Sequence, residues 1–205
     1  MRCVNCGAFS LRMICAACAA NLAECHLSMR QVEGFSVFYY YGYSEIRELI
    51  LSKHHEYGAA VLARIASLSL AKFPLHLRRE ISANPQNYEA FRTDGIFKFN
   101  AVPLDDDARS GYSHTAILAR ALKSELVEPK FHCLRAQNRV KYTGQSLEFR
   151  LKHKRNFKIL TPPKFPVILV DDIITSGLSM LQARESLIDG GFMPVCGLVL
   201  ANAKE

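Results

Sequence analysis

The residues best suited to chemistry lie in one run near the C-terminus, Val167-Ile-Leu-Val-Asp-Asp-Ile-Ile-Thr-Ser-Gly-Leu-Ser179. Its four apolar residues predict a buried parallel strand, and ligands of open α/β sheets bind at the carboxyl ends of such strands. The carboxylates of Asp171 and Asp172 follow, and their oxygens suit ribose hydroxyls or a magnesium shell. A Thr-Ser-Gly turn then opens a helix, whose free N–H groups favour phosphate. The other interpretation is an acidic turn that only caps the helix.

Four cysteines near the N-terminus have the spacing of metal ligands: Cys3, Cys6, Cys15 and Cys18. A C-x-x-C pair brings two thiolates to one ion, and two pairs complete a closed tetrahedral site. Gly7 suits the turn after the first pair. The alternative is that reduced thiols simply pack inside. We expect structural Zn²⁺, because four thiolates leave no open position for catalysis and the metal would supply the folding energy of so short a segment.

A third candidate site is the basic stretch 139–158, where seven basic residues outnumber one acid, Glu148. Its candidate nucleic-acid ligands are Arg139, Lys141, Arg150, Lys152, Lys154, Arg155 and Lys158. Three aromatic residues are interleaved with them, as in surfaces on which single-stranded bases stack. The alternative is a solvated helix face whose aromatic side chains point into the core. Arg135 and Lys53 could add to the same positive field or to the phosphate site.

The composition of the whole chain limits the class of protein. Its 205 residues are 49% hydrophobic and 22% charged, as in a folded globular protein. The net charge of +7 favours a phosphate-bearing partner, although a generally basic proteome would give the same sign. We see no run of about 20 apolar residues and no signal-peptide pattern, so we expect a cytoplasmic protein without membrane insertion. In a reducing compartment, seven cysteines indicate metal or free thiols rather than disulfides.

The elements that must position these residues alternate between strand and helix, which predicts a mostly parallel α/β sheet. Strands are predicted at 35–41, 96–102, 167–170 and 193–200. Helices are predicted at 45–53, 57–72, 113–127 and 178–189. Residues 74–94 are predicted to be irregular, with room for a helical turn at 75–81. The cysteine density falls after residue 25, which places a domain boundary near residue 30.

The run from Val167 to Ser179 resembles the phosphoribosyl-pyrophosphate (PRPP) signature of type I phosphoribosyltransferases. The resemblance implies that Asp171 and Asp172 bind the ribose hydroxyls. It also implies a turn that holds the 5-phosphate, formed by Thr175, Ser176, Gly177, Leu178 and Ser179. Serines stand at 176 and 179 where that family more often has threonine, and this keeps the hydroxyl groups. Mg²⁺ would accompany the pyrophosphate.

The order of parts along the chain is similar to that of the ComF family of competence-associated, phosphoribosyltransferase-like proteins. These parts are the cysteine cluster, Tyr43-Ser-Glu-Ile-Arg-Glu-Leu-Ile50 with Lys53, Val102-Pro-Leu104, Gln145, Asn156-Phe157 and the loop. The resemblance implies PRPP as ligand and single-stranded DNA as partner during natural transformation. It also implies contact with other DNA-uptake proteins.

One segment departs from the family pattern. After Val-Pro-Leu, the family usually has a basic or histidine residue and then an Arg-Gly-Phe-Asn-Gln-like run, whereas this chain has Asp105-Asp-Asp107 and Arg109-Ser-Gly-Tyr-Ser-His114. The three carboxylates could bind magnesium with the pyrophosphate, could repel the pyrophosphate, or could form a solvated turn. We therefore assign no catalytic residue and leave open whether the chain transfers a phosphoribosyl group.

These observations predict an α/β chain with a type I phosphoribosyltransferase fold over residues 31–205 and a zinc-binding module over residues 1–30. The predicted function is that of a cytoplasmic competence protein that binds PRPP and single-stranded DNA. Two alternatives remain, an active phosphoribosyltransferase of nucleotide metabolism and a PRPP-sensing regulator that lost the chemistry. The cysteine module and the basic stretch favour the first function, since a metabolic enzyme has no obvious need for either.

Overall fold

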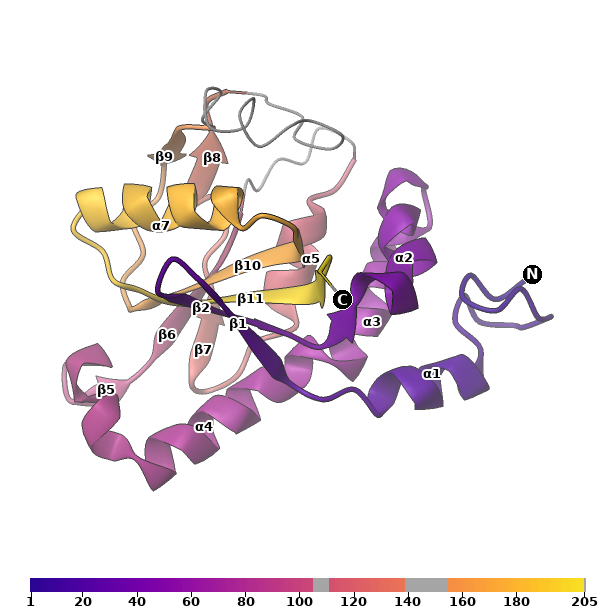
Figure 1. The fold of residues 1–205 in the computed structure, drawn as a ribbon, viewed down its shortest axis with the longest axis horizontal. Coiled ribbons are helices and arrows are strands. Elements are labelled where there is room, and N and C mark those ends of the chain that lie inside the picture. Colours follow the sequence, from indigo (N-terminus) through magenta and orange to yellow (C-terminus); the bar gives the residue numbers. More distant parts are fainter. Residues whose placement is uncertain (105–110, 139–154, 205) are drawn as a thin grey trace.

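The computed structural model describes residues 1–104, 111–138 and 155–204 (Figure 1). Its centre is a sheet with the strand order β1-β2-β11-β10-β6-β7. The strands are β1 (Ser28–Val32), β2 (Phe35–Tyr39), β6 (Phe99–Pro103), β7 (Val127–Pro129), β10 (Val167–Ile174) and β11 (Pro194–Asn202), and β3 (Tyr41–Gly42) also pairs with β11. Only the β1–β2 pair of this sheet is antiparallel among the described residues. The predicted mostly parallel sheet is therefore confirmed.

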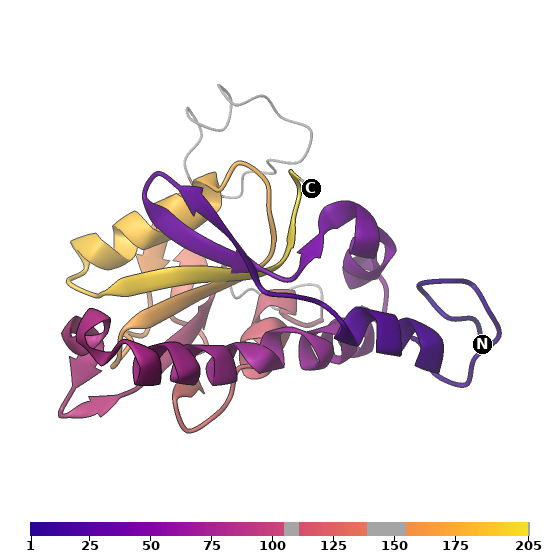
Figure 2. The same cartoon turned by 60° about the horizontal axis from the view of Figure 1, so that its bottom comes forward.

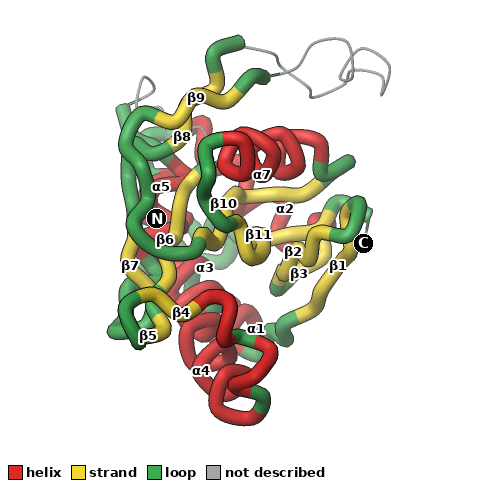
Figure 3. Tube along the Cα trace, turned by 90° about the vertical axis from the view of Figure 1, so that its left-hand side faces the viewer, coloured by secondary structure: helices red, strands yellow, loops and turns green. Residues whose placement is uncertain are grey.

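Helices flank both faces of the sheet (Figure 3). One face carries α1 (Ala16–Ala23), α2 (Tyr43–Leu51), α3 (Gly58–Leu68), α4 (Phe73–Ala83) and α5 (His114–Arg120), and the other carries α7 (Leu178–Asp189). Side chains alternate between the faces of a strand. In β10, Ile168 and Val170 accordingly pack with the first group of helices, whereas Val167 and Leu169 pack with α7.

Short elements complete the described chain. Four 3₁₀ helices are present, namely η1 (Ser52–His54), η2 (Leu70–Lys72), η3 (Pro85–Asn87) and η4 (Glu89–Phe91). Two small hairpins lie outside the main sheet, β4 (Arg92–Thr93) with β5 (Ile96–Phe97) and β8 (Leu134–Ala136) with β9 (Phe157–Ile159). The second hairpin brings together the chain on either side of residues 139–154.

The strand order reverses direction between β6 and β10. From β6 the chain passes through α5 to β7 on one side, and from β10 it passes through α7 to β11 on the other. Because crossovers between parallel strands are right-handed, the two helices lie on opposite faces of the sheet. Such a reversal leaves a crevice at the carboxyl ends of the two strands, which is the usual ligand site of open α/β sheets.

The prediction of an irregular segment at 74–94 is wrong for its first part, because α4 spans Phe73–Ala83. Pro74 stands in the first turn of that helix, where its missing N–H costs no hydrogen bond. The helical stretch Gly58–Ala83 is in consequence long and apolar enough, by length and composition, to cross a membrane, which the sequence had not indicated. Figure 2 shows it lying along the sheet, and its buried residues belong to the core, as in any core helix.

Two further boundaries differ from the predictions. The helix predicted at 113–127 ends at Arg120, and Val127 instead begins β7 by pairing with Phe99. The strand predicted at 167–170 continues to Ile174, because its pairing with β11 extends as far as Asn202. The helix at 178–189 is confirmed as α7.

The N-terminal segment packs against the rest of the chain. Cys18 and Leu22 of α1 are buried in the same apolar cluster as α3, and the Tyr41 hydroxyl donates a 2.8 Å hydrogen bond to the Leu22 carbonyl. The unpredicted strand β1 follows α1 and turns into β2 through Glu33 and Gly34, both with positive φ, as in a type I′ hairpin turn. A domain boundary near residue 30 stays a prediction, and residue 30 itself lies within β1.

Candidate functional site

The acidic pair lies at the carboxyl end of β10, beside the reversal of strand order. Asp171 and Asp172 are inside the strand rather than after it, and neighbouring positions of a strand face opposite sides of the sheet. The Asp172 N–H nevertheless donates a 2.9 Å hydrogen bond to Asp171 Oδ1. One ligand atom each from Asp171, Asp172 and His114 also lies within 4.8 Å of the other two. Three groups that can bind hydroxyls or cations therefore converge at this edge.

Asp172 is buried and paired with a cation. The ammonium of Lys53, in η1, lies 2.5 Å from Asp172 Oδ2, and the imidazole Nε2 of His114 lies 4.0 Å from the same oxygen. The Tyr112 hydroxyl donates a 2.9 Å hydrogen bond to the Lys53 carbonyl and so helps to hold η1 in place. Burial raises the pKa of Asp172, but the charges of Lys53 and His114 outweigh it, and the net shift is downward. Asp172 is thus a carboxylate at neutral pH.

Asp171 is in the opposite electrostatic state. Burial raises the pKa of its carboxyl group, the neighbouring Asp172 charge raises it further, and the result is a pKa of about 8. The Asp172 N–H, Arg155 and Lys53 act in the other direction without offsetting these effects. Two adjacent carboxyl groups with different proton affinity can offer one hydroxyl donor and several acceptors to a polyol.

The turn after β10 leads into α7 through a glycine in the left-handed conformation. Gly177 precedes α7 with φ +85° and ψ −2°, in the left-handed region. The Leu178 N–H donates to the Ser176 hydroxyl at 3.4 Å, and the hydroxyls of Ser176 and Ser179 are partly exposed. The turn therefore presents hydroxyls and the N-terminal end of a 12-residue helix near the carboxyl end of β10.

The β1–β2 hairpin supports this turn, which the sequence did not reveal. Arg30 of β1 donates from Nη1 to the Thr175 carbonyl at 2.8 Å and to Asn202 Oδ1 at 3.2 Å. An added Cβ at Gly177 would lie 2.6 Å from Val32 Cγ1. Nothing in the local sequence relates Arg30 to Thr175, since 145 positions separate them.

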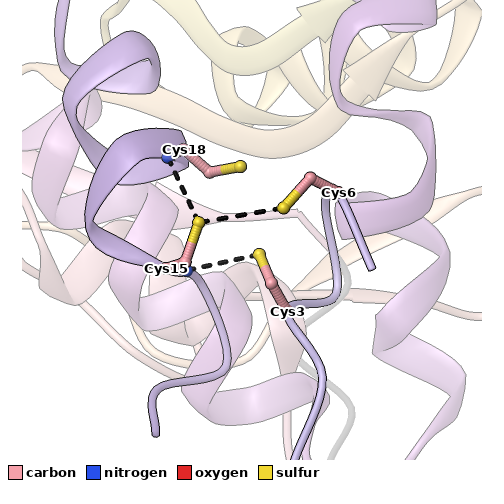
Figure 4. A group of neighbouring side chains, drawn as sticks. All are labelled: Cys3, Cys6, Cys15 and Cys18. Carbon is pink, nitrogen blue, oxygen red and sulfur yellow. Dashed lines mark hydrogen bonds between the residues drawn. The ribbon is translucent and has the colours of Figure 1, made fainter. Parts of the chain in front are cut away.

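The four N-terminal cysteines form a cluster that could bind a metal ion such as zinc (Figure 4). Their Sγ atoms all lie within 4.8 Å of one another, and Cys6 Sγ and Cys15 Sγ are 3.8 Å apart. That separation fits an edge of a tetrahedron with Zn–S bonds of about 2.3 Å, whereas a disulfide needs about 2.05 Å. Gly7 has φ +74°, which confirms the turn expected after the first pair.

Backbone N–H groups favour the thiolate form of Cys3 in this cluster. A contact with Asn5 lowers the pKa of Cys18, but burial and the other cysteine side chains outweigh it and raise that pKa to about 12. The Cys15 N–H donates to Cys3 Sγ at 3.3 Å, and the Cys18 N–H donates to Cys15 Sγ at 3.5 Å. Burial raises the pKa of Cys3, but backbone hydrogen bonds from Cys15, Cys6 and Asn5 outweigh it and lower the pKa to about 6. Since metals bind the thiolate form, this arrangement suits a sulfur-ligated ion.

Most of the basic stretch lies outside the described residues. The basic residues outside the described part of the chain are Arg139, Lys141, Arg150, Lys152 and Lys154. Gln145 of the same stretch also lies outside it, as do Asp105-Asp-Asp107 and Arg109 of the earlier acidic segment. Arg155 is partly buried, and its charge lowers the pKa of Asp171, so it lies near the acidic pair. Lys158 is exposed on β9, directly opposite the exposed Arg135 of β8.

His114 was not predicted as a site residue. The sequence analysis named it only as the end of the segment that departs from the family pattern. His114 is the first residue of α5, and Ser113 is the N-cap of that helix. The Ser113 hydroxyl accepts a 3.1 Å hydrogen bond from the Ala116 N–H, which fixes the start of the helix and brings His114 close to Asp172. The signal that could have indicated His114 is its place at the start of a predicted helix that follows a strand end.

A scan against protein-family models finds no match to the chain, and a search of curated proteins finds no significant similarity.

Proposed function

We propose that this chain binds PRPP at the crevice between β6 and β10 and has a type I phosphoribosyltransferase fold of the ComF kind. The observation that carries the proposal is the joint placement of the acidic pair, Lys53 and the Gly177 turn at the point where the strand order reverses. Asp171 and Asp172 would hold the ribose hydroxyls, and residues 175–179 would hold the 5-phosphate. Mg²⁺ would arrive with the pyrophosphate and neutralise part of its charge.

The charge pattern supports a ligand that carries both hydroxyls and phosphate. A carboxylate repels phosphate but accepts hydrogen bonds from hydroxyls, and Asp172 is kept ionised by Lys53. A helix N-terminus favours an anion, and α7 begins only six residues after Asp172 in a left-handed turn. The two halves of the site therefore differ in preference, and a sugar phosphate satisfies both.

Three roles are consistent with PRPP binding. We favour a cytoplasmic protein that takes part in DNA uptake, because its cysteine cluster and positive charge exceed what a metabolic enzyme needs. An active phosphoribosyltransferase would also need a site for the acceptor base, and a PRPP-sensing regulator would need only the binding residues. Product formation with a panel of bases separates the enzyme from the other two.

The direct test of PRPP binding is isothermal titration calorimetry with Mg·PRPP, comparing the wild type with the double variant Asp171→Asn, Asp172→Asn. The double change keeps the size of both side chains but removes the charged acceptor of Asp172 and the acid hydroxyl of Asp171, so binding should weaken at least tenfold. The control is Asp189→Asn, at the exposed end of α7, which should bind as the wild type does. Equal affinity in the double variant would place the ligand elsewhere.

Among the described residues, the β8–β9 hairpin is the feature that supports binding of single-stranded DNA. Arg135 and Lys158 are direct cross-strand partners, so their side chains share one face, and both are exposed. Like charges placed opposite each other destabilise a hairpin unless an anion lies between or near them. Phosphates of a nucleic acid would relieve this repulsion, and the adjoining basic stretch would extend the surface.

This proposal predicts weaker DNA binding when the hairpin charges are removed. We expect Arg135→Gln with Lys158→Gln to lower the affinity for a labelled single-stranded oligonucleotide and to reduce the salt slope of log K by about 0.7 for each lost contact. Fluorescence anisotropy across a salt series measures both quantities. Arg79→Gln, an exposed arginine on α4, is the matched control. An unchanged slope in the hairpin variant would remove this face from the DNA surface.

A further inference from the structure

The phosphate loop has a partner that its proposed function does not include, the guanidinium of Arg30. Its Nη1 donates to the Thr175 carbonyl at 2.8 Å and to the buried Asn202, at the end of β11, at 3.2 Å. One arginine nitrogen thus joins three segments, the edge strand β1, the end of β11 and the turn after β10. The arginine itself is only partly exposed, and these two hydrogen bonds hold its guanidinium.

The contact with the Thr175 carbonyl fixes the direction of the next amide. In a trans peptide unit, the C=O and the following N–H point in opposite directions. When Arg30 holds the Thr175 carbonyl toward β1, the Ser176 N–H must point away from β1. The Ser176 N–H is the first of the turn amides that a phosphate at the start of α7 would meet.

A second contact from the same strand fixes the next residue. Val32 lies against Gly177 so closely that a Cβ there would be 2.6 Å from its Cγ1. Gly177 carries the left-handed conformation that turns the chain into α7. Arg30 and Val32 alternate along β1 and therefore lie on one face of it, with Gln31 on the other. One face of β1 thus supports two successive residues of the turn.

We propose that Arg30 is a positioning residue of the phosphate site, holding the Thr175–Ser176 peptide in the orientation that receives phosphate. This inference rests on the proposed PRPP function for its ligand, but the orientation of the turn is a property of the free protein. It also makes β1 a connection between the cysteine cluster and the phosphate loop. β1 begins five residues after α1 ends, and Cys18 of the cluster lies in α1.

The experiment compares wild type, Arg30→Met, Arg30→Lys and the control Gln31→Met by two measurements. The first is the ¹⁵N NMR order parameter of residues 175–178 without ligand. In Arg30→Met it should fall from rigid-backbone values of about 0.85 toward about 0.6, because the carbonyl loses its donor. The second is calorimetry with Mg·PRPP, where Arg30→Met should bind about tenfold more weakly. Arg30→Lys, which keeps a charged donor, should recover part of both losses, and Gln31→Met should change neither.

The outcomes separate this inference from the proposed function. If no variant, wild type included, binds PRPP, the proposed function fails, and the order parameters alone decide on Arg30. If the wild type binds PRPP and Arg30→Met has the same affinity and the same order parameters, Arg30 positions nothing. Thermal unfolding of each variant shows whether the whole fold is weakened. A general loss of folding would also lower the order parameters in α3, whereas a local loss would change only those of the turn.

Discussion

At the scale of single residues, the acidic pair shows how one strand end can hold two different protonation states. The ammonium of Lys53 lies 2.5 Å from Asp172, which is an anion, whereas Asp171 is half-buried beside that anion and has a pKa of about 8. Sequence reasoning treated the two as equivalent acceptors. The difference arises because Lys53, 119 residues away along the chain, pairs with Asp172 and not with Asp171. The sequence suggested Lys53 for this site or for the basic field, but not which carboxyl group it would meet.

The raised pKa of Asp171 makes stability depend on pH. The folded state holds its proton between about pH 4 and pH 8, where the unfolded chain has lost it, so the stabilisation is complete near pH 4 and is lost as the pH rises through 8. Asp171→Asn cannot ionise. At pH 9, we expect the free energy of unfolding of this variant to exceed that of the wild type by on the order of 1–3 kcal/mol. At pH 4, the two free energies should differ little. Denaturant unfolding at both values measures this, and an equal difference at both would refute the assignment.

Gly177 offers a second test at the same scale. Gly177→Ala places a Cβ 2.6 Å from Val32 Cγ1 and forces alanine into a left-handed backbone, so we expect a loss of about 2–4 kcal/mol in unfolding free energy. Gly191→Ala is the matched control, since it also has positive φ but no atom within 4 Å of the added Cβ. It should lose only about 1 kcal/mol. Similar losses in the two variants would mean that β1 does not press on the turn.

At the scale of elements, the four-cysteine cluster could bind a metal ion such as zinc. We expect purified protein to contain about one zinc per chain, and Cys3→Ser to lose it, because three thiolates no longer close the site. Cys25→Ser is the control, since Cys25 lies outside the quartet and its thiol donates to the Leu68 carbonyl instead. Elemental analysis of both variants measures the metal. Full zinc content in Cys3→Ser would show that other residues bind it.

Elements with strong local signals could be predicted from the sequence, and those set by distant partners could not. The apolar run at 167–170 and the following helix were predictable because burial pattern and capping turn are local. The strand β1 was not, because its polar sequence Ser-Met-Arg-Gln-Val has little strand signal and is held by β2. The helix α4 was missed because Pro74 resembles a helix breaker, although it stands in a first turn.

At the scale of the whole molecule, the fold brings three segments to one edge of the sheet. Figure 1 shows α2 and the N-terminal segment on the side toward which β10 and β11 run. The mostly parallel pairing of the sheet and the clustering of the four cysteines could be predicted, since both follow from sequence patterns within 30 residues. The β10–α7 part of the site could be predicted, and Lys53 was expected either there or in the basic field. Lys53, His114 and Arg30 are placed by the way helices and β1 pack on the sheet.

We propose that the turn after β10 holds the 5-phosphate of PRPP and that the acidic pair holds its ribose. A crystal structure of the protein with Mg·PRPP would locate the ligand. We expect phosphate density within hydrogen-bond distance of the backbone and hydroxyls of Thr175–Ser179, with ribose hydroxyls at Asp171 and Asp172. Ordered PRPP at any other place, with this turn unliganded, would contradict it.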